Sequence, residues 1–470
     1  MALTYQDLME VQDIDKDRVQ FVLKAIRQHQ QSDMYKVAEI ADQYYRKQNT
    51  TIINYQKTLT TASGRTILDE WSPNHKVVSG FFSRFVRQQN QYLLSNGAMW
   101  GDDSTADKLG KKFDSQLQKL GKAALIGGVA FGFWNLDHLQ VFKVTEFVPL
   151  FDEENGSLRS GIRFWQIDAS KPLRATLYEE DGYTDYIWNA RENKDGEILH
   201  AKRSYKIVKR VNQAEGEEII DTQNYPNFPI IPMWANEEHQ SELVGIRDGI
   251  DAYDLIKNGF ENDLDTAQIY WIVKGAGGMD NQDLVQFLER LYKNKIASVE
   301  GDQSIEAQTI NIPFEARERL LDRIERDLYR DYQALNTDEI KSGSVVTAQI
   351  KAAYEGMNSK ADDYEYMVTD FIDNLMLIVG IDDEATFQRS MLVNQTEQIE
   401  VILQAAQYLP SEYVTEKILT ILGDADKLDD VLAGMDAESM TRIAESPEIE
   451  GDEGDTQDDE SQGAATQEEV

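Results

Sequence analysis

The 470-residue sequence contains no cysteine, so disulfide bonds and thiolate metal sites are excluded. It also lacks an apolar run of the roughly 18 residues that a membrane-spanning helix needs. The first residues show no basic stretch followed by an apolar core, and we therefore expect no signal peptide. Together these absences predict a soluble intracellular protein. Its length suggests about two to four domains.

Sequence patterns that support catalysis are missing as well. The histidines are scattered without the paired spacing of a zinc site, at His29, His75, His138, His200 and His239. No GxxxxGK[ST], GxGxxG or GxSxG pattern occurs, and we interpret the glycines at 127–132 and 275–278 as turns or close-packed strands. Acid pairs such as Asp102-Asp103 are expected by composition alone among 84 acidic residues. We therefore expect no active site, no metal, no cofactor and no enzymatic activity.

The chain is strongly acidic, with a formal net charge of −37. Eleven acidic residues and no Lys or Arg lie in 445–470, so residues 1–444 still carry −26. Affinity for duplex DNA comes mainly from Lys and Arg that neutralise phosphates. The sequence therefore excludes a wide DNA-gripping surface, although such a protein could surround DNA without adhering to it. The acidic end has no apolar pattern and is predicted to be disordered.

The part before residue 241 divides into a helical and a β-rich stretch. Residues 1–122 are predicted to be helical, with Ser32 as the N-cap of a helix through Lys47 and an aromatic-rich helix between Val77 and Gly97. From 123 to 235, short β-rich runs alternate with turn sequences such as Glu154-Asn155-Gly156. Because the connections leave no room for crossover helices, we predict an antiparallel sheet.

Two long helices with thin apolar seams are predicted next, at 241–266 and 313–336. The seam positions are Leu243, Ile246, Ile250, Tyr253, Phe260 and Leu264 in the first helix and Leu321, Ile324, Leu328 and Leu335 in the second. About two apolar positions per heptad are too few for a core helix, so we expect each helix to pack beside copies of itself. A Gly/Ser break at 337–346 precedes a third long helix at 347–380.

Charges surround these seams, and two interpretations of them stay open. The arginines are Arg317, Arg319, Arg323, Arg326 and Arg330, and the acids include Asp322 on the second helix and Asp251 and Asp254 on the first. In one interpretation the charges pair along a solvated helix, as at Glu315–Arg319, for about a few tenths of a kcal/mol per pair. In the other, arginine and acidic faces meet across neighbouring subunits.

The order of these segments resembles that of tailed-bacteriophage portal proteins, in particular the long-tailed siphophage type. The resemblance covers about residues 35–435 and rests on the order of several stretches, since no single one of them is specific. These stretches are Tyr44-Tyr45-Arg46, 74–96, Leu125–Phe151 followed by Arg159–Trp165, Asn227-Phe228-Pro229-Ile230-Ile231-Pro232 with Asn236-Glu237, Asp251-Ala252-Tyr253-Asp254, Ser342-Gly343-Ser344 and Val393-Asn394-Gln395-Thr396-Glu397. The spacing departs from the usual pattern around Tyr408–Asp430.

The resemblance implies an α+β, predominantly helical subunit that assembles as a ring, usually of twelve copies. In the family's terms, 1–122 and 123–235 are the helical and β-rich parts of the wing, 241–266 and 313–336 the stem helices, and 268–312 a small α/β clip. Residues 337–346 are then the tunnel loop, 347–380 the long helix of the wing, 381–444 the helical crown and 445–470 the disordered acidic tail.

The function that the resemblance implies is a DNA channel at one capsid vertex, for genome packaging, head-to-tail joining and DNA ejection. Implied partners are identical subunits, the terminase large subunit, the head-completion adaptor, the major capsid and scaffolding proteins, and double-stranded DNA passing non-specifically, with no membrane. The implied location is the virion, after assembly in the host bacterial cytoplasm. The expected docking residues of the clip are Asp280, Asp283, Arg290, Lys293 and Lys295, and those of the channel loop are Lys341, Ser342, Gly343 and Ser344.

Two other classes of function stay open at the sequence level. One is another oligomeric virion or scaffold protein that shares the acidic helical character, and the other is an acidic metal-dependent hydrolase or nuclease. The mass in solution separates them, because a mass near twelve times 53.7 kDa supports the ring. A monomer with Mg²⁺-dependent turnover supports the enzyme.

The resemblance generates one prediction at the channel loop. Twelve copies of Lys341 form a single ring of cations that touches passing DNA, because an acidic wall otherwise repels phosphates. We expect Lys341→Glu to reduce retention of DNA in packaged heads without preventing ring assembly, as measured by the DNA content of purified heads. Normal DNA retention in that variant contradicts the idea.

Overall fold

The computed structural model describes residues 3–11, 14–60, 64–69, 72–189, 193–211, 218–266, 270–274, 304–308, 314–337, 352–390, 395–422, 427–428 and 431–434. The predicted clip residues Asp280, Asp283, Arg290, Lys293 and Lys295 lie outside this set. So do Lys341, Ser342, Gly343 and Ser344 and the acidic end from 445. The chain divides into two compact units, Met1–Met391 and Leu392–Val470. Helices and strands are mixed, which confirms the α+β class.

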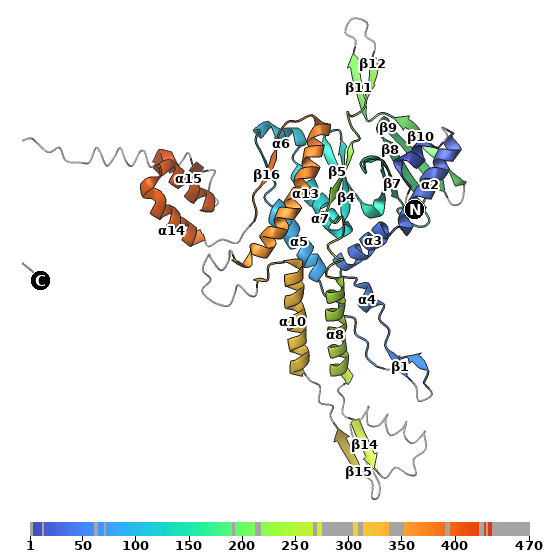
Figure 1. Cartoon of the computed structure of the whole chain (residues 1–470), viewed down its shortest axis with the longest axis vertical. Helices are drawn as coiled ribbons and strands as arrows, with labels where there is room; N and C mark the ends of the chain where they lie inside the picture. The colour runs from blue at the N-terminus through green and yellow to red at the C-terminus, as the bar shows by residue number, and fades with distance from the viewer. Residues whose placement is uncertain are drawn as a thin grey trace, which may run out of the picture. The chain divides into compact units, whose positions relative to one another are not determined.

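The first unit contains helices before, between and after its strands (Figure 1). They are α1 (Tyr5–Met9), α2 (Asp15–Gln31), α3 (Asp33–Tyr45), α4 (Thr50–Ile53), α5 (Phe81–Leu94), α6 (Asp103–Leu109), α7 (Phe113–Gly127), η1 (Val144–Glu146), α8 (Arg247–Thr266), α10 (Phe314–Tyr332) and α13 (Glu355–Val379). Ser32 caps α3 as predicted, because its side chain accepts a hydrogen bond from the Tyr35 N–H.

Antiparallel sheets account for the β-rich stretch, as predicted. Strands β6 (Phe147–Phe151), β7 (Leu158–Trp165), β8 (Leu173–Glu179), β9 (Gly182–Asn189) and β10 (Asn193–Arg203) form a five-stranded sheet in the order β10-β9-β8-β7-β6. Strands β13 (Ile230–Trp234), β4 (Val129–Asn135) and β5 (His138–Lys143) form a second sheet in the order β13-β4-β5.

Two-stranded antiparallel pairs complete the strands that the structure describes. They are β1 (Thr58–Thr60) with β2 (Thr66–Leu68), β11 (Lys206–Val211) with β12 (Glu218–Gln223), β14 (Tyr270–Lys274) with β15 (Ser304–Gln308), and β16 (Ala385–Phe387) with β3 (Ala98–Trp100). The hairpin β1–β2 leaves the body of the unit on the side of α8, and β11–β12 projects from the sheets (Figure 1).

The sequence places the start of the β-rich stretch too early. Helix α7 continues through Gly127, and strand β4 begins only at Val129. Gly128 separates them with a φ of 86°, a left-handed conformation that favours glycine. At Gly132 in β4, an added Cβ would lie 2.5 Å from the Phe371 ring of α13, so this glycine is a close-packed strand position, as predicted.

One large core joins the helices to the three-stranded sheet. It contains Phe82 and Phe85 of α5, Phe131 of β4 and Phe371 of α13. A second core lies between α2 and the five-stranded sheet, around Val22 and Tyr186. His29 of α2 is buried beside the second core, and its Nε2 lies 2.8 Å from the Val144 carbonyl oxygen. Burial lowers the pKa of His29, which favours the neutral packing role expected for it.

The second unit contains α14 (Gln395–Ala405), η2 (Ala406–Tyr408) and α15 (Ser411–Leu422), and α14 packs on α15. Its helices bury little, because Val414 is the one buried hydrophobic residue among its described residues. By contrast, Val401, Leu403 and Tyr408 are 59%, 55% and 81% exposed. This helix pair therefore has no hydrophobic core of its own in the part that the structure describes.

Candidate functional site

The two predicted long helices form an antiparallel pair, α8 and α10 (Figure 1). Near the start of α8, an added Cβ at Gly249 would lie 2.8 Å from Leu328, near the end of α10. Toward the other end, the rings of Phe260 and Phe314 are 5.6 Å apart, and Arg317 pairs with Asp263 at 2.6 Å. The pair is therefore built from contacts within one chain.

The apolar seams are buried at one end of the pair and exposed at the other. Ile246, Ile250 and Leu328 belong to the large core and are at most 4% exposed. At the far end, Leu264 and Phe314 are each 46% exposed. The prediction that the seams lack a core of their own therefore applies to the far half of the helices, whereas the near half joins the core of the chain.

A ladder of polar side chains runs along another face of α8. Asp254, Asn258 and Asn262 are spaced four residues apart and are 0%, 2% and 4% exposed. These side chains bind the backbone of an extended segment, residues 72–80, which we call the strap. The carboxylate or amide oxygens of the ladder accept hydrogen bonds from the backbone N–H groups of Ser79 at 2.9 Å, Val77 at 2.6 Å and His75 at 2.7 Å, in that order.

The spacing of the ladder fits that of an extended chain. Four residues of α-helix rise about 6 Å, and two residues of extended chain span about 6.6 Å. A polar residue at every fourth helix position therefore meets every second backbone N–H of the strap. The strap runs antiparallel to α8, since Ser79 lies at Asp254 and His75 at Asn262. Asn258 makes two such contacts, because its Nδ2 also donates to the Val77 carbonyl at 2.8 Å.

The acids predicted to face a neighbouring subunit from α8 are engaged inside the chain instead. Asp254 Oδ2 accepts a hydrogen bond from Asn49 Nδ2, and Asp251 accepts hydrogen bonds from the hydroxyls of Tyr44 and Thr51. Burial raises the pKa of Asp254, although the hydrogen bonds from Ser79 and Asn49 oppose that rise. The assignment of Asp254 to a subunit interface is therefore wrong, because its carboxylate is fully buried by its own chain.

Four of the five arginines of α10 lie on one exposed face. Arg319, Arg323, Arg326 and Arg330 are spaced by four, three and four residues, so they form a ridge opposite the apolar seam. Arg319 pairs with Glu315 at 3.6 Å, and Arg330 pairs with Asp327 at 2.8 Å. Their side chains are nevertheless 82% and 74% exposed. Within one chain, the charges thus pair along the helix, and exposed pairs of this kind stabilise little.

Beside this ridge lies a second charged strip, formed by Glu318, Asp322 and Glu325. We call it the acidic stripe. Their spacing of four and three residues places the carboxylates on one face of α10. Within the described residues, none of the three carboxylates forms an ion pair. Asp322 contributes only its backbone carbonyl, which accepts a hydrogen bond from Arg326 Nε at 3.3 Å.

A partly buried charge pair connects α13 to the ends of α8 and α10 that lie at the core. Lys360 Nζ lies 2.6 Å from Glu242 Oε2 and 3.9 Å from the centre of the Tyr332 ring. Glu242 Oε1 also accepts a hydrogen bond from Asn236 Nδ2 at 3.0 Å, and the Tyr332 hydroxyl donates to Gln89 at 2.6 Å. These residues line an open cavity of about 290 Å³. The start of α8, the end of α10 and the long helix α13 therefore share one polar junction.

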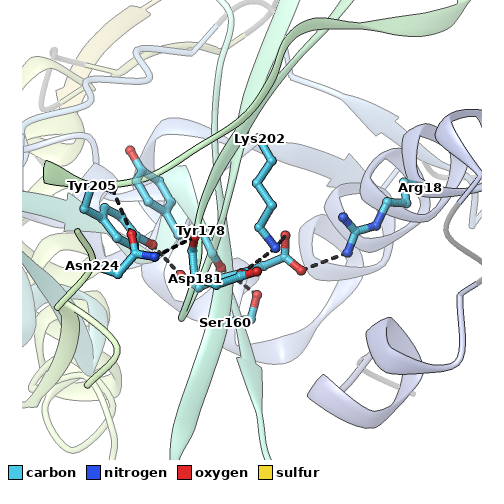
Figure 2. A network of polar contacts seen from close by, with 8 residues as sticks. Arg18, Ser160, Tyr178, Asp181, Lys202, Tyr205 and Asn224 are labelled. Carbon is cyan, nitrogen blue, oxygen red and sulfur yellow. Dashed lines mark hydrogen bonds and ion pairs between the residues drawn. The ribbon is translucent and has the colours of Figure 1, made fainter. Parts of the chain in front are cut away.

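A second polar network fixes α2 and the base of the β11–β12 hairpin to the five-stranded sheet, as Figure 2 shows. Glu179 pairs with Arg18 of α2 at 2.8 Å and with Lys202 of β10 at 3.2 Å. The Tyr205 hydroxyl donates to the Glu179 carbonyl at 2.6 Å, and Asn224 donates to the Asp181 carbonyl at 2.9 Å. Because these contacts come from four separate segments, the hairpin leaves the sheet from a fixed base.

The described residues contain neither a candidate membrane span nor a candidate metal site. None of their helices is both long and apolar enough to cross a membrane. No group of three or more His, Asp or Glu side chains in this part of the chain is arranged to hold a metal ion. The strap ladder was missed by the sequence analysis, which treated α8 as an apolar seam with acids. Its signal is the spacing Asp254-x₃-Asn258-x₃-Asn262, because asparagine is a poor choice for a helix interior.

Comparisons with known proteins point to one family. A family model described as phage portal protein, SPP1 Gp6-like, matches residues 23–445. The portal protein of Bacillus phage SPP1 is 23% identical over 393 residues, which cover 77% of this chain and 76% of that protein. The portal protein of Clostridium phage phiCD119 is 25% identical over 209 residues, which cover 42% of this chain and 46% of that protein. The chain therefore spans about half the length of the phiCD119 relative.

Two solved structures also resemble the chain. A chain from the neck of an empty GTA particle has a TM-score of 0.41 and 11% identity, with 73% of this chain and 90% of that chain covered. A chain from the virion of a native gene transfer agent particle has a TM-score of 0.41 and 12% identity, with 72% and 89% covered.

The ladder predicts how the strap responds to changes at Asn258. Replacing Asn258 by Ala removes both of its hydrogen bonds to Val77 and leaves buried backbone groups unpaired, which costs about 1–3 kcal/mol. We expect faster amide exchange in a peptide covering 72–80, measured by hydrogen–deuterium exchange. Asp373→Ala, on an exposed position of α13, is the control and should leave this exchange unchanged. Equal protection in Asn258→Ala and wild type contradicts the ladder.

The raised pKa of Asp254 predicts that the stability of the folded chain depends on pH. Its folded-state pKa is raised, so its contribution to stability is present at low pH and is lost as pH rises through that pKa. In Asp254→Asn, the new amide oxygen can accept from the Ser79 N–H. The new Nδ2 can donate to Asn49 Oδ1, which is buried without a partner, once the Asn49 amide flips to bring this oxygen in place of its Nδ2. We expect this variant to keep the strap protected and to lose this pH dependence, whereas Asp254→Ala exposes the strap. Thermal melts from pH 4 to pH 7 measure the difference, and identical pH profiles for Asp254→Asn and wild type refute it.

Proposed function

Because the chain belongs to the SPP1 Gp6-like family of phage portal proteins, we propose that it assembles as a ring at one vertex of a phage capsid. The ring, of twelve copies in this proposal, surrounds the channel through which DNA is packaged and ejected and joins the head to the tail. The chain is then a structural component of the virion without enzymatic activity, assembled in the host bacterial cytoplasm.

The observation that carries this proposal is the half-covered helix pair. The near ends of α8 and α10 are buried in the core, whereas Leu264 and Phe314 at the far ends stay about half exposed. A neighbouring copy in a ring supplies the missing cover for this stem. The helices of the second unit support the same conclusion, because Val401, Leu403 and Tyr408 are exposed with almost no core beneath them. Exposed apolar side chains on helices with so little core of their own indicate surfaces that a partner can cover.

Charge supports a channel that lets DNA move. Each chain carries −37, and a ring multiplies this charge around its axis. Adsorption of duplex DNA needs Lys and Arg that release counterions from phosphates, so an acidic wall keeps the DNA mobile. Lys341 in the predicted tunnel loop is proposed as the contact that touches passing DNA.

The arginine ridge of α10 is proposed to face a neighbouring subunit. Arg319, Arg323 and Arg330 are exposed on the side opposite the seam, and their partners along the helix leave them 74–82% exposed. On α8, Asp248 is an exposed acid, whereas Asp251 and Asp254 are held inside the chain. The acid that we propose to contact the ridge is therefore Asp248 rather than Asp254.

The remaining partners follow from the family and stay proposals. Residues 268–312 form the clip that meets the terminase large subunit and later the head-completion adaptor. The proposed contacts are Asp280, Asp283, Arg290, Lys293 and Lys295. The wing and crown meet the major capsid and scaffolding proteins. Light scattering tests the ring, because a mass near twelve times 53.7 kDa supports it and a monomer refutes it.

The arginine ridge gives a direct test of the subunit contact. Changing Arg319, Arg323 and Arg330 together to Glu places like charges against the acidic neighbour, so we expect assembly to weaken by about tenfold or more at low salt. Light scattering measures the mass, and circular dichroism verifies that helicity is kept. Lys16→Glu, on an exposed position of α2, is the control for a single charge reversal outside the ridge. Full-size rings in the triple variant contradict the proposed role of the ridge.

A further inference from the structure

The segment from Ile53 to the strap has apolar side chains that its own chain leaves exposed. Its hairpin β1–β2 has two strands of three residues each, and every described residue of β2 is exposed. An isolated two-stranded hairpin is marginally stable in water. Ile67 and Leu68 on the hairpin are each 50% exposed, and Val77 on the strap is 37% exposed. This segment therefore presents apolar side chains that another surface must cover.

Among the described residues of the segment, the charged side chains that reach solvent are cationic, in contrast to the chain as a whole. Lys57, Arg65 and Lys76 reach solvent, whereas the carboxylate of Asp69 is buried and accepts a hydrogen bond from the Ser72 N–H at 3.0 Å. A chain with a net charge of −37 thus places a basic, partly apolar surface beside α8. Its complement is an acidic surface with some apolar character.

The acidic stripe of α10 has these properties. Glu318, Asp322 and Glu325 lie on one face, and within the described residues their carboxylates have no ion-pair partner. Phe314, one turn before Glu318, continues this face and is 46% exposed. The stripe thus offers both the negative charge and the apolar contact that the strap and its hairpin lack.

The strap of a chain is placed away from the acidic stripe of the same chain. Asn258 faces the strap and Phe260 faces α10, and two helix positions are separated by roughly 160° around the axis. The strap and α10 therefore lie on nearly opposite flanks of α8. The α8 helix stands between them, so a second copy is the source of an acidic stripe within reach.

The heights along the helices agree with such a contact. Val77 lies at the level of Asn258 on α8, and Asn258 is close to the level at which Phe260 meets Phe314. Asp322 lies two turns along α10 from Phe314, about 12 Å away. With α8 and α10 along the axis of the proposed ring, a neighbouring copy presents its stripe at heights from about 6 Å (Glu318) to about 12 Å (Asp322) from that level.

We infer that the strap and β1–β2 hairpin of one subunit dock on the acidic stripe of α10 in the next subunit. The contact is head-to-tail, with different surfaces on the two partners, and contacts of this type generate rings when the rotation between subunits closes. This inference rests on the proposed ring and adds to it a clamp that spans the subunit boundary. The polar ladder then serves assembly, because it holds the strap in the extended form that the neighbour binds.

Cross-linking tests the clamp cleanly, because the sequence has no cysteine that could react. Subunits with Val77→Cys and Asp322→Cys are assembled and treated with a short bis-maleimide. We expect a series of covalently linked oligomers on a denaturing gel. Only cross-links between subunits raise the mass of a band. The matched control pairs Val77→Cys with Leu320→Cys. Leu320 is also exposed and lies near the height of Asp322, but it points roughly 160° away around α10.

The outcomes separate this inference from the proposed ring. Cross-linked oligomers from the Val77–Asp322 cysteine pair, with little product from the Val77–Leu320 pair, support the clamp. Rings of full mass that give no cross-linked oligomers from the Val77–Asp322 pair, or equal amounts from both pairs, overturn the clamp. The proposed ring then still stands. Monomers in the unmodified protein overturn both.

Charge exchange gives a second test that does not depend on cross-linker reach. We expect Lys76→Glu and Asp322→Lys each to weaken assembly by roughly threefold to tenfold at low salt, with the effect reduced at high salt. Combining them restores the attraction, so the double variant should assemble better than either single one. A double variant as weak as the sum of the two single changes overturns the inference.

Discussion

The hydrogen bonds between the α8 ladder and the strap are the constraint on which the region around α8 depends. Residues 54–80 form a long excursion between α4 and α5, with a hairpin that has almost no core of its own. Ordering each residue of such a segment costs about 1–2 kcal/mol of backbone entropy. Asp254, Asn258 and Asn262 offset part of that cost by pairing buried backbone groups of the strap. In return, the strap covers the one face of α8 that carries buried polar side chains.

The placement of charge follows from the same arrangement. Two acids of α8, Asp251 and Asp254, are used inside the chain, where they bind hydroxyl, amide and backbone donors. Acids on α10 stay at the surface, next to an arginine ridge that pairs with them only along the helix. One set of carboxylates is thus bound inside the chain, and the other set stays exposed and can contact partners. Composition alone, with a net charge of −37, does not distinguish these two sets.

The sequence predicted most of the architecture and little of the site. Periodicity located α5, α8, α10 and α13, and turn spacing indicated the antiparallel sheets, because these signals are local. The partner of a polar helix face is not a local property. Asp254 therefore looked like one more surface acid, although a strap some 175 residues earlier in the sequence buries it completely. The boundary at Ala123 failed for a related reason, since α7 continues until Gly128 permits the turn into β4.

A single copy of this chain is incomplete in a way that its family membership explains. The far half of the α8–α10 pair, the β1–β2 hairpin and the α14–α15 pair all have exposed apolar side chains and little local core. Short helices and lone hairpins gain most of their stability from tertiary packing, so these three elements depend on contacts outside the described fold. If those contacts come from identical subunits, assembly and the ordering of the stem are one process, and the stability of each subunit rises with occupancy of its neighbours' surfaces. The cores around Phe85 and Tyr186 are complete within one chain, whereas the far half of the α8–α10 pair becomes fully covered only in contact with a partner.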